Sequence, residues 1–308
     1  MERDFIAWLR ARVPRHPLLR LGPGDDAAVL SMAGTDECVV TVDLLTDHVD
    51  FELAQVDPAR VGRKAMAVNL SDLAAMAAVP LAAVIAVALP RKGGMELAVK
   101  LYEGMLPLAQ QYEVAIAGGD TNSWDGPLVL SVTLLGRVTG RGALRRSGAR
   151  PGDRILVTGR FGGSILGKQF EFEPRVREAI LLNERYDLHA GIDVSDGLSI
   201  DLAHLTQESG CGALVQLDRV PISEAAGRLV AQLGDGSTPL DHALGDGEDF
   251  ELILAVPPGE ARRMLAEQPL GEPLADIGEF VAEPGLWQRT GSRPRTPLVP
   301  TGWEHKFS

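Results

Sequence analysis

Cysteine, aromatic residues and long apolar runs are all scarce in this 308-residue chain. Its two cysteines, Cys38 and Cys211, are too few and too far apart for a disulfide framework or a cysteine metal site. No apolar run reaches the ~18 residues that a membrane-spanning helix needs. The first residues are acidic where a signal peptide would be basic and then apolar. The sequence therefore predicts a cytoplasmic protein with no membrane partner.

Basic residues are also fewer than acidic residues. The chain has 30 Lys and Arg residues against 42 Asp and Glu residues, for a formal net charge of −12. A nucleic-acid-binding surface needs clustered Lys and Arg to displace counterions, so we expect no nucleic-acid partner. An acidic balance by itself is typical of a solvated surface, and the places where the acidic residues stand are more informative than their number.

Strand-like and helix-like segments alternate along most of the chain. Strands are expected at 38–42, 114–117, 128–135, 154–158, 191–194, 213–217 and 250–256, and helices at about 58–79, 95–111, 174–185, 198–209 and 259–268. Residues 139–153 contain four glycines and a proline, which favours a connection between domains. We therefore predict an α/β (α+β) protein with two domains, 1–145 and 146–308, and an irregular tail at 283–308.

One aspartate stands on what should be a buried helical face. Val61, Ala65, Val68 and Asp72 follow the spacing of a single helical stripe, so Asp72 continues an apolar row. A carboxylate on such a face costs several kcal/mol unless a cation or hydrogen bonds compensate it. Asp72 is therefore either a capping residue at a helix break or a metal ligand.

Other aspartates stand beside the ends of the expected strands or next to glycine and serine. They are Asp25 and Asp26, Asp43, Asp120, and the pair Asp193 and Asp196. Any one of them is more often a turn or cap residue, but ligand sites gather at strand ends in layered α/β proteins. Oxygen-only ligands select hard cations such as Mg²⁺, which can bridge carboxylates to phosphates. An acidic cleft would repel a nucleotide, so phosphate binding there would require such ions.

Two other kinds of site are disfavoured. Residues 162–168 fit the first seven positions of a P-loop, but Gln169 replaces the Ser or Thr whose hydroxyl should hold Mg²⁺. The chain has no Gly-x-Ser-x-Gly motif, and its six histidines are scattered without ligand spacing.

Six motifs in order resemble those of the thiamine-monophosphate kinase family: GPGDDAAVL at 22–30, NLSDLAAM at 69–76, GGDT at 118–121, RSGARPGD at 146–153, IDVSDGL at 192–198 and GEDFEL at 247–252. The family belongs to a superfamily with aminoimidazole ribonucleotide synthetase. The resemblance implies an N-terminal sheet that pairs with a second subunit into a barrel, giving a homodimer, and a larger C-terminal α/β domain. It also implies direct transfer of the ATP γ-phosphoryl group to thiamine monophosphate, with several Mg²⁺ ions.

The resemblance also assigns roles to residues. It implies that the metal positions are Asp26, Thr41, Val42, Asp43, Asp72, Asp120, Asp193 and Asp196. It implies that Gly119, Asp120, Arg146 and Ser195 face ATP, with Asp120 and Arg146 as the catalytic residues. Glu248 and Trp303 match positions on the substrate side. The transfer needs no strong general base, because the attacking phosphate oxygen is already largely ionised at neutral pH.

One position departs from the family pattern. Asp50 stands where the family has a histidine that contacts the substrate phosphate, and His48 lies two residues away. If Asp50 faces the substrate phosphate, it repels it by about 1–4 kcal/mol at 4 Å. Two alternatives therefore stay open: an enzyme of the same superfamily that phosphorylates another acceptor, and a nucleotide-binding relative without catalysis.

Overall fold

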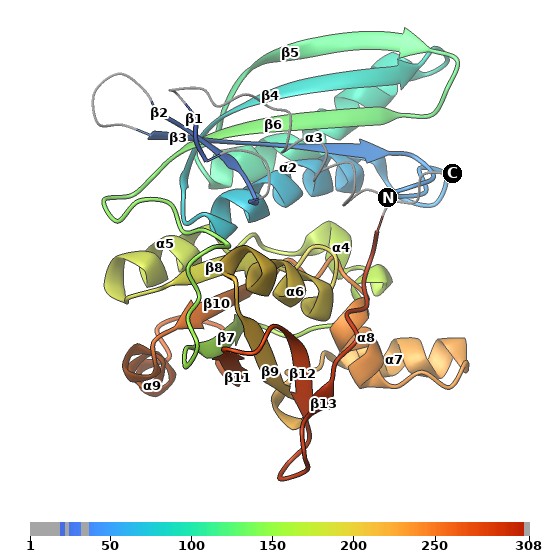
Figure 1. Cartoon of the computed structure of the whole chain (residues 1–308). Coiled ribbons are helices and arrows are strands. Elements are labelled where there is room, and N and C mark those ends of the chain that lie inside the picture. The colour runs from blue at the N-terminus through green and yellow to red at the C-terminus, as the bar shows by residue number, and fades with distance from the viewer. Residues whose placement is uncertain (1–18, 22–24, 32–36, 305–308) are drawn as a thin grey trace.

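The computed structural model describes residues 19–21, 25–31 and 37–304, which form two β-sheets with helices between and below them (Figure 1). The fold is a mixed α/β arrangement of two halves. None of the helices in the described part of the chain is both long enough and apolar enough to cross a lipid bilayer.

The first half is built on a six-stranded sheet. Its order is β1 (Leu19–Leu21), β2 (Ala28–Ser31), β3 (Glu37–Thr46), β6 (Val129–Arg137), β4 (Val79–Pro90) and β5 (Ala115–Trp124). Only the β4–β5 pair is parallel. The described strands leave β1 and β5 at the two edges, so within one chain this sheet is open and does not close into a barrel.

Two helices, α2 (Pro58–Ala75) and α3 (Gly94–Gln111), lie beneath this sheet (Figure 1). They approach each other closely because glycines face the partner's backbone at the crossing. A Cβ atom on Gly62 would lie 1.9 Å from the carbonyl oxygen of Leu101, and one on Gly104 would lie 1.7 Å from that of Ala59. The crossing fixes α2, which carries much of the site described below.

Replacing Gly104 by alanine is expected to lower the free energy of unfolding by about 3 kcal/mol, because the added methyl group must displace the backbone of α2. Gly227, inside α7 (Glu224–Leu233), is the matched control, since a Cβ there meets nothing within 4 Å. Gly227→Ala should raise the free energy of unfolding by about 0.5–1 kcal/mol through helix propensity. Urea unfolding of both variants checks this, and equal effects would contradict the close crossing.

The second half contains a seven-stranded mixed sheet. Its order is β13 (Thr296–Pro297), β12 (Gly285–Arg289), β9 (Gly212–Gln216), β11 (Leu274–Val281), β7 (Arg154–Thr158), β10 (Leu252–Val256) and β8 (Ala190–Asp193). The helices α4 (Lys168–Glu171), α5 (Val176–Arg185) and α9 (Pro258–Glu267) contribute to the core on one side. On the other side lie α6 (Leu198–Ser209) and α8 (Pro239–Gly245), with α7 beside α8.

Alternation along β10 divides the core of this half between the two faces of its sheet. Leu252, Leu254 and Val256 belong to a core that continues through α5 and α2 to the first sheet. Ile253 and Ala255 face the separate core beneath, around α6 and α8. This is the period of two that a strand buried on both faces requires. Because α2 packs against both halves, it lies at their boundary (Figure 1).

Several predicted elements need correction. Residues 283–308 are not wholly irregular, because β12 and β13 lie there. The strands predicted at 38–42 and 114–117 extend further, so Asp43 and Asp120 lie inside strands and not after them. The helix predicted to Val79 ends at Ala75, and Val79 begins β4, for which no strand was predicted.

Candidate functional site

Three aspartates from distant parts of the chain meet at the boundary of the two halves. Asp26 precedes β2, Asp72 lies near the end of α2, and Asp193 ends β8. One carboxylate oxygen of each lies within 4.8 Å of the others. We call these three residues the carboxylate cluster. Asp26 and Asp193 are buried and Asp72 is half-buried, so the negative charges meet where solvent screens them poorly.

Hydroxyl groups hold two of the three carboxylates in place. Thr41 on β3 donates to an oxygen of Asp72. Ser71 donates to Oδ2 of Asp193 over 2.5 Å, which joins α2 of the first half to β8 of the second. Burial, and then the charges of Asp43, Asp193 and Asp26, raise the pKa of Asp72 well above its usual value. Burial and the Asp26 charge do the same to the pKa of Asp193.

Asp43 extends this charge along β3. Burial, with a smaller contribution from the Asp50 charge, raises the pKa of Asp43 to about 6. Its Oδ2 atom is buried without a hydrogen-bond partner among the described residues. An unpartnered carboxylate oxygen whose charge acts on Asp72 of the cluster is the arrangement that a hard divalent cation would relieve. The donor set thus fits Mg²⁺ by chemistry: oxygen atoms alone, with negative charge in excess.

Arg146 supplies the positive charge beside the cluster. Its Nη2 atom lies 2.6 Å from Oδ1 of Asp26 and its Nε atom 3.1 Å from Oδ2, a paired geometry that holds the guanidinium plane in one orientation. The main-chain amide of Arg146 donates to the Asp25 carboxylate. Burial and the Asp26 charge raise the pKa of Asp25 to about 6.

Three predicted residues of the second half lie at or beside the loop after β8: Ser195 is on that loop, and Glu248 and Trp303 contact it. Glu248 pairs with Nζ of Lys64 at 2.5 Å, and its amide donates to the carbonyl of Ser195 over 2.7 Å. The amide of Trp303 donates to the carbonyl of Asp196 over 2.9 Å. Trp303 is 55% exposed. The structure thus brings Ser195 and Glu248 into direct contact.

Asp50 is held by its own turn. Its Oδ2 atom accepts from the main-chain amide of Thr46 over 2.6 Å, so one carboxylate oxygen is engaged at the end of β3. His48 instead points to Glu52, with 3.0 Å between Nδ1 and Oε2. Burial raises the pKa values of Asp43 and Glu248, and the negative charge of Asp50 adds to both shifts.

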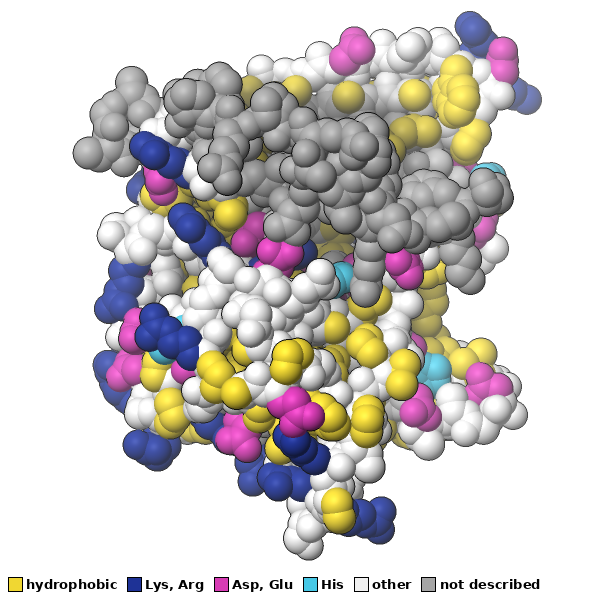
Figure 2. All heavy atoms as spheres, in the orientation of Figure 1, with side chains coloured by type: hydrophobic (Ala, Val, Ile, Leu, Met, Phe, Trp, Pro, Cys, Tyr) yellow, Lys and Arg dark blue, Asp and Glu magenta, His cyan; other side chains and the backbone are white. Residues whose placement is uncertain are grey.

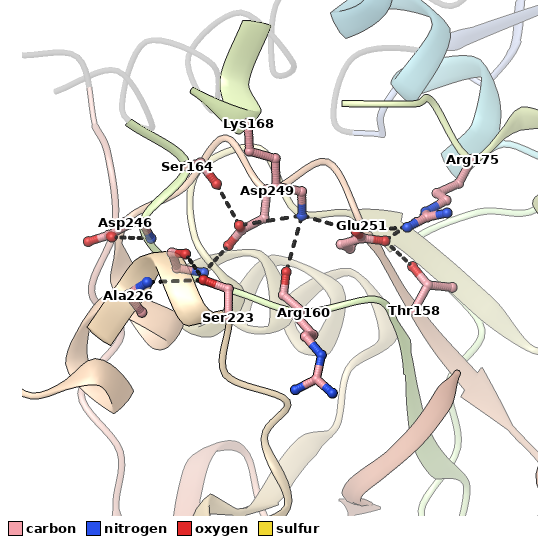
Figure 3. A network of polar contacts seen from close by, with 12 residues as sticks. Thr158, Arg160, Ser164, Lys168, Arg175, Ser223, Ala226, Asp246, Asp249 and Glu251 are labelled. Carbon is pink, nitrogen blue, oxygen red and sulfur yellow. Dashed lines mark hydrogen bonds and ion pairs between the residues drawn. The ribbon is translucent and has the colours of Figure 1, made fainter. Parts of the chain in front are cut away.

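A buried polar network supports the segment that carries Glu248 (Figure 3). Lys168 lies 3.0 Å from Glu251 and 3.6 Å from Asp249, and Arg175 and Thr158 also bind Glu251. Asp249 accepts from the Ser164 hydroxyl over 2.6 Å and from the Gly162 amide over 2.9 Å. The glycine-rich loop at 162–168 therefore directs main-chain amides to carboxylates, which agrees with the prediction that it is not a P-loop.

Four further residues that the resemblance assigned to metal or ATP lie away from the carboxylate cluster. Asp120 and Gly119 are exposed on the edge strand β5, which is three strand spacings, about 14 Å, from β3. A Cβ on Gly119 would meet the carbonyl of Ile85 at 1.8 Å, so that glycine is required by the pairing with β4. Val42 is 60% exposed on the sheet face opposite Thr41 and Asp43. Asp196 instead forms a separate group with Asp201 and His204.

Sequence reasoning assigned no role to Ser71 or Lys64. It named Asp25 among the candidate carboxylates but gave the metal role to its neighbour Asp26. The sequence did contain an indication that Lys64 belongs to the site. Lys64 is a cation within the mostly apolar stretch of the predicted helix, eight residues before Asp72. That spacing places both side chains on one helical face.

The fold and the cluster define a two-domain class of proteins. The family model described as AIR synthase related protein, N-terminal domain, matches residues 24–138, and the one for the C-terminal domain matches residues 140–286. The structure of AaThiL complexed with AMPPCP and TMP shares the fold, with a TM-score of 0.81, 24% identity, and coverage of 99% of this chain and 96% of that one.

Two relatives with higher sequence identity show which family of this class the chain belongs to. The thiamine-monophosphate kinase of Rhodopirellula baltica is 43% identical over 99% of this chain and 97% of its own length. The crystal structure of thiamine-monophosphate kinase from Stenotrophomonas maltophilia K279a is 35% identical, with a TM-score of 0.71 and coverage of 92% and 94%. The chain belongs to the thiamine-monophosphate kinase family, as the six motifs predicted.

Proposed function

We propose that this chain is a cytoplasmic enzyme that transfers the γ-phosphoryl group of ATP to thiamine monophosphate, giving thiamine diphosphate and ADP. The observation that carries the proposal is the carboxylate cluster with Arg146 at the boundary of the two halves. The chain that carries it is 43% identical to the thiamine-monophosphate kinase of Rhodopirellula baltica. The structural neighbour AaThiL, solved with AMPPCP and TMP, supports the same pair of substrates. We retain 1–145 and 146–308 as the proposed domains.

The cluster would hold several Mg²⁺ ions through Asp26, Asp72 and Asp193, with Asp43 and the Thr41 hydroxyl beside them. When bound, Mg²⁺ supplies positive charge that offsets the charge of the phosphates. The Arg146 guanidinium presents forked donors to phosphate oxygens at the same place. We propose that Ser195, on the loop after β8, faces the nucleotide from the second half.

No protein group needs to form a covalent bond in this reaction. A phosphate oxygen of the acceptor forms a bond to the γ-phosphorus as the bond to the β–γ bridging oxygen breaks, and the electron pair leaves with ADP. Positioning and charge stabilisation then account for most of the rate. Glu248 and Trp303 would bind the acceptor, and the engagement of Asp50 with the Thr46 amide limits its repulsion of the acceptor phosphate.

ATP consumption measured with and without thiamine monophosphate tests the proposal. We expect ADP and thiamine diphosphate to appear in a ratio of one to one, and ADP formation to require the acceptor. ADP formation that proceeds only with another acceptor would assign the chain to a different reaction. ATP binding without any turnover would make it a nucleotide-binding relative.

We also propose that the first sheet pairs with a second copy of the chain. The edge strand β5 is exposed along most of its length, and Val42 and Leu44 are each 60% exposed on the open face of the sheet. An exposed edge and apolar face are typical of a surface covered by another chain. Pairing would also surround Asp120 and Gly119, whose roles toward metal and ATP we place in the assembled dimer.

Light scattering at micromolar concentration should give a mass of about 66 kDa, twice the 32.9 kDa of one chain. Leu44→Glu should shift the mass toward one chain, because it places a charge on the apolar face. A mass near 33 kDa for the unsubstituted protein would contradict the dimer.

A further inference from the structure

The helix α2 connects the two ends of the site. Asp72 lies in the carboxylate cluster, and Lys64 lies eight residues earlier on the same face, about 12 Å away along the helix axis. On the face shown in Figure 2, acidic and basic side chains gather along the boundary between the two halves. Lys64 itself is not on that surface, because it is only 1% exposed.

The Lys64 ammonium group has three partners from three separate segments. It lies 2.8 Å from the main-chain oxygen of Asp50, 2.9 Å from Oε1 of Gln169 and 2.5 Å from Oε1 of Glu248. It also lies over the ring of Phe170, 5.2 Å from the centroid. A lysine has three N–H donors, and all three are used here. Lys64 therefore has no donor left for a ligand, whereas the residues that it holds face the acceptor end of the site.

The backbone around Glu248 is held in place by residues other than Lys64. Glu248 and Phe250 have positive φ angles of 53° and 50°, which L-residues adopt only when their surroundings impose it. The network of Lys168, Asp249 and Glu251 in Figure 3 supplies that constraint, and the Phe250 ring stacks on Phe172 with centroids 4.1 Å apart. Lys64 then fixes the free end of Glu248.

The loop that carries Asp50 depends on the same ammonium group. Asp50 folds its carboxylate back to the Thr46 amide, and the amide of His48 donates to the carbonyl of Phe51 over 2.8 Å. The main-chain oxygen of Asp50 accepts from the buried Lys64 ammonium group. One side chain thus joins the loop after β3, the helix α4 and the segment of Glu248, which belong to different halves.

We propose that Lys64 is a positioning residue for the phosphate acceptor: by holding Asp50 and Glu248 together across the two halves, it sets the shape of the acceptor end without touching the nucleotide end. This inference rests on the proposed function, because it takes Asp50 and Glu248 as the acceptor side. It adds that the affinity for the acceptor depends on the ion pair between the buried Lys64 of α2 and Glu248 of the second half, two helical turns from the carboxylate cluster.

Steady-state kinetics of Lys64→Met tests the inference, because methionine retains much of the apolar volume and removes the ammonium group. We expect the KM for thiamine monophosphate to rise at least tenfold and the KM for ATP to stay within twofold. Arg60→Met is the matched control: Arg60 lies one turn earlier, over the same Phe170 ring at 5.2 Å, and pairs with the exposed Glu171. It should leave both KM values within twofold.

A second variant keeps the test decisive if Lys64→Met fails to fold because Glu248 loses its partner. The double variant Lys64→Met/Glu248→Gln removes both charges of the pair. If Lys64 acts through Glu248, the KM of the double variant for thiamine monophosphate should rise by less than the product of the rises in the two single variants. If only the double variant folds, its KM for thiamine monophosphate should be at least tenfold above that of the unsubstituted protein.

An equal rise in the KM for ATP, or no rise in either KM, would overturn the inference. Failure of the proposed function would look different, because the unsubstituted chain would then form no ADP in response to thiamine monophosphate.

Discussion

Asp72→Asn is expected to lower kcat about a thousandfold while raising the free energy of unfolding of the metal-free protein. Asparagine keeps the shape of the side chain and can still accept the Thr41 hydrogen bond. It removes a negative charge that burial and Asp43, Asp193 and Asp26 all disfavour, which should stabilise the metal-free protein by about 1–3 kcal/mol. The same change removes charge that the metal ions and the transition state require.

A buried aspartate outside the cluster provides the matched control. Asp153 accepts from the Arg150 amide and from His189, each over 2.8 Å, within the second half of the molecule. Asp153→Asn should lower the free energy of unfolding by about 1–3 kcal/mol because it disrupts satisfied bonds, while kcat stays within threefold. If Asp72→Asn kept normal turnover at saturating Mg²⁺, Asp72 would not be a ligand.

Removal of Mg²⁺ is expected to weaken ATP binding more than a hundredfold. The carboxylate cluster and Asp43 concentrate negative charge at the place proposed for the triphosphate. Each unit-charge repulsion at 4 Å costs about 1–4 kcal/mol, and a hundredfold loss of affinity corresponds to about 2.8 kcal/mol. Calorimetric titration of ATP in excess Mg²⁺ and in excess chelator, at matched ionic strength, measures the difference.

Adenosine is the control ligand for that titration, since it has no phosphate to repel. Its affinity should be the same in Mg²⁺ and in chelator. An ATP affinity that also stayed unchanged would mean that the phosphates bind away from the carboxylates.

The sequence predicted the helices and central strands well where apolar periodicity was clear, as for α6 at 198–209 and β7 at 154–158. It failed at 76–90. The four alanines and one methionine at 74–78 favour a helix by propensity, yet α2 ends at Ala75 and Ala77 adopts a φ of 50°. The following strand β4 is rich in alanine and valine and has no polar residue, so no alternation of apolar and polar residues marks it.

Chemistry marked several aspartates as candidate metal ligands, because carboxylates in apolar positions require compensation and ligand sites gather at strand ends. Which of them meet depends on tertiary packing between residues up to 167 positions apart, as between Asp26 and Asp193. That is why Asp120, on the exposed strand β5, could not be separated from the others beforehand. Lys64 escaped prediction because lysine is mostly a surface residue, and its burial appears only once three segments converge on it.

Binding of a non-hydrolysable ATP analogue to the unsubstituted protein and to Asp72→Asn, each in Mg²⁺ and in chelator, tests the central claim most directly. The claim is that the carboxylates bind nucleotide phosphates only through divalent ions. It predicts a reversal of sign: Asp72→Asn should weaken binding at least tenfold in Mg²⁺, and should leave binding unchanged or strengthen it in chelator, where one repulsive charge is gone. A substitution that weakened binding by the same factor in both conditions would contradict the account.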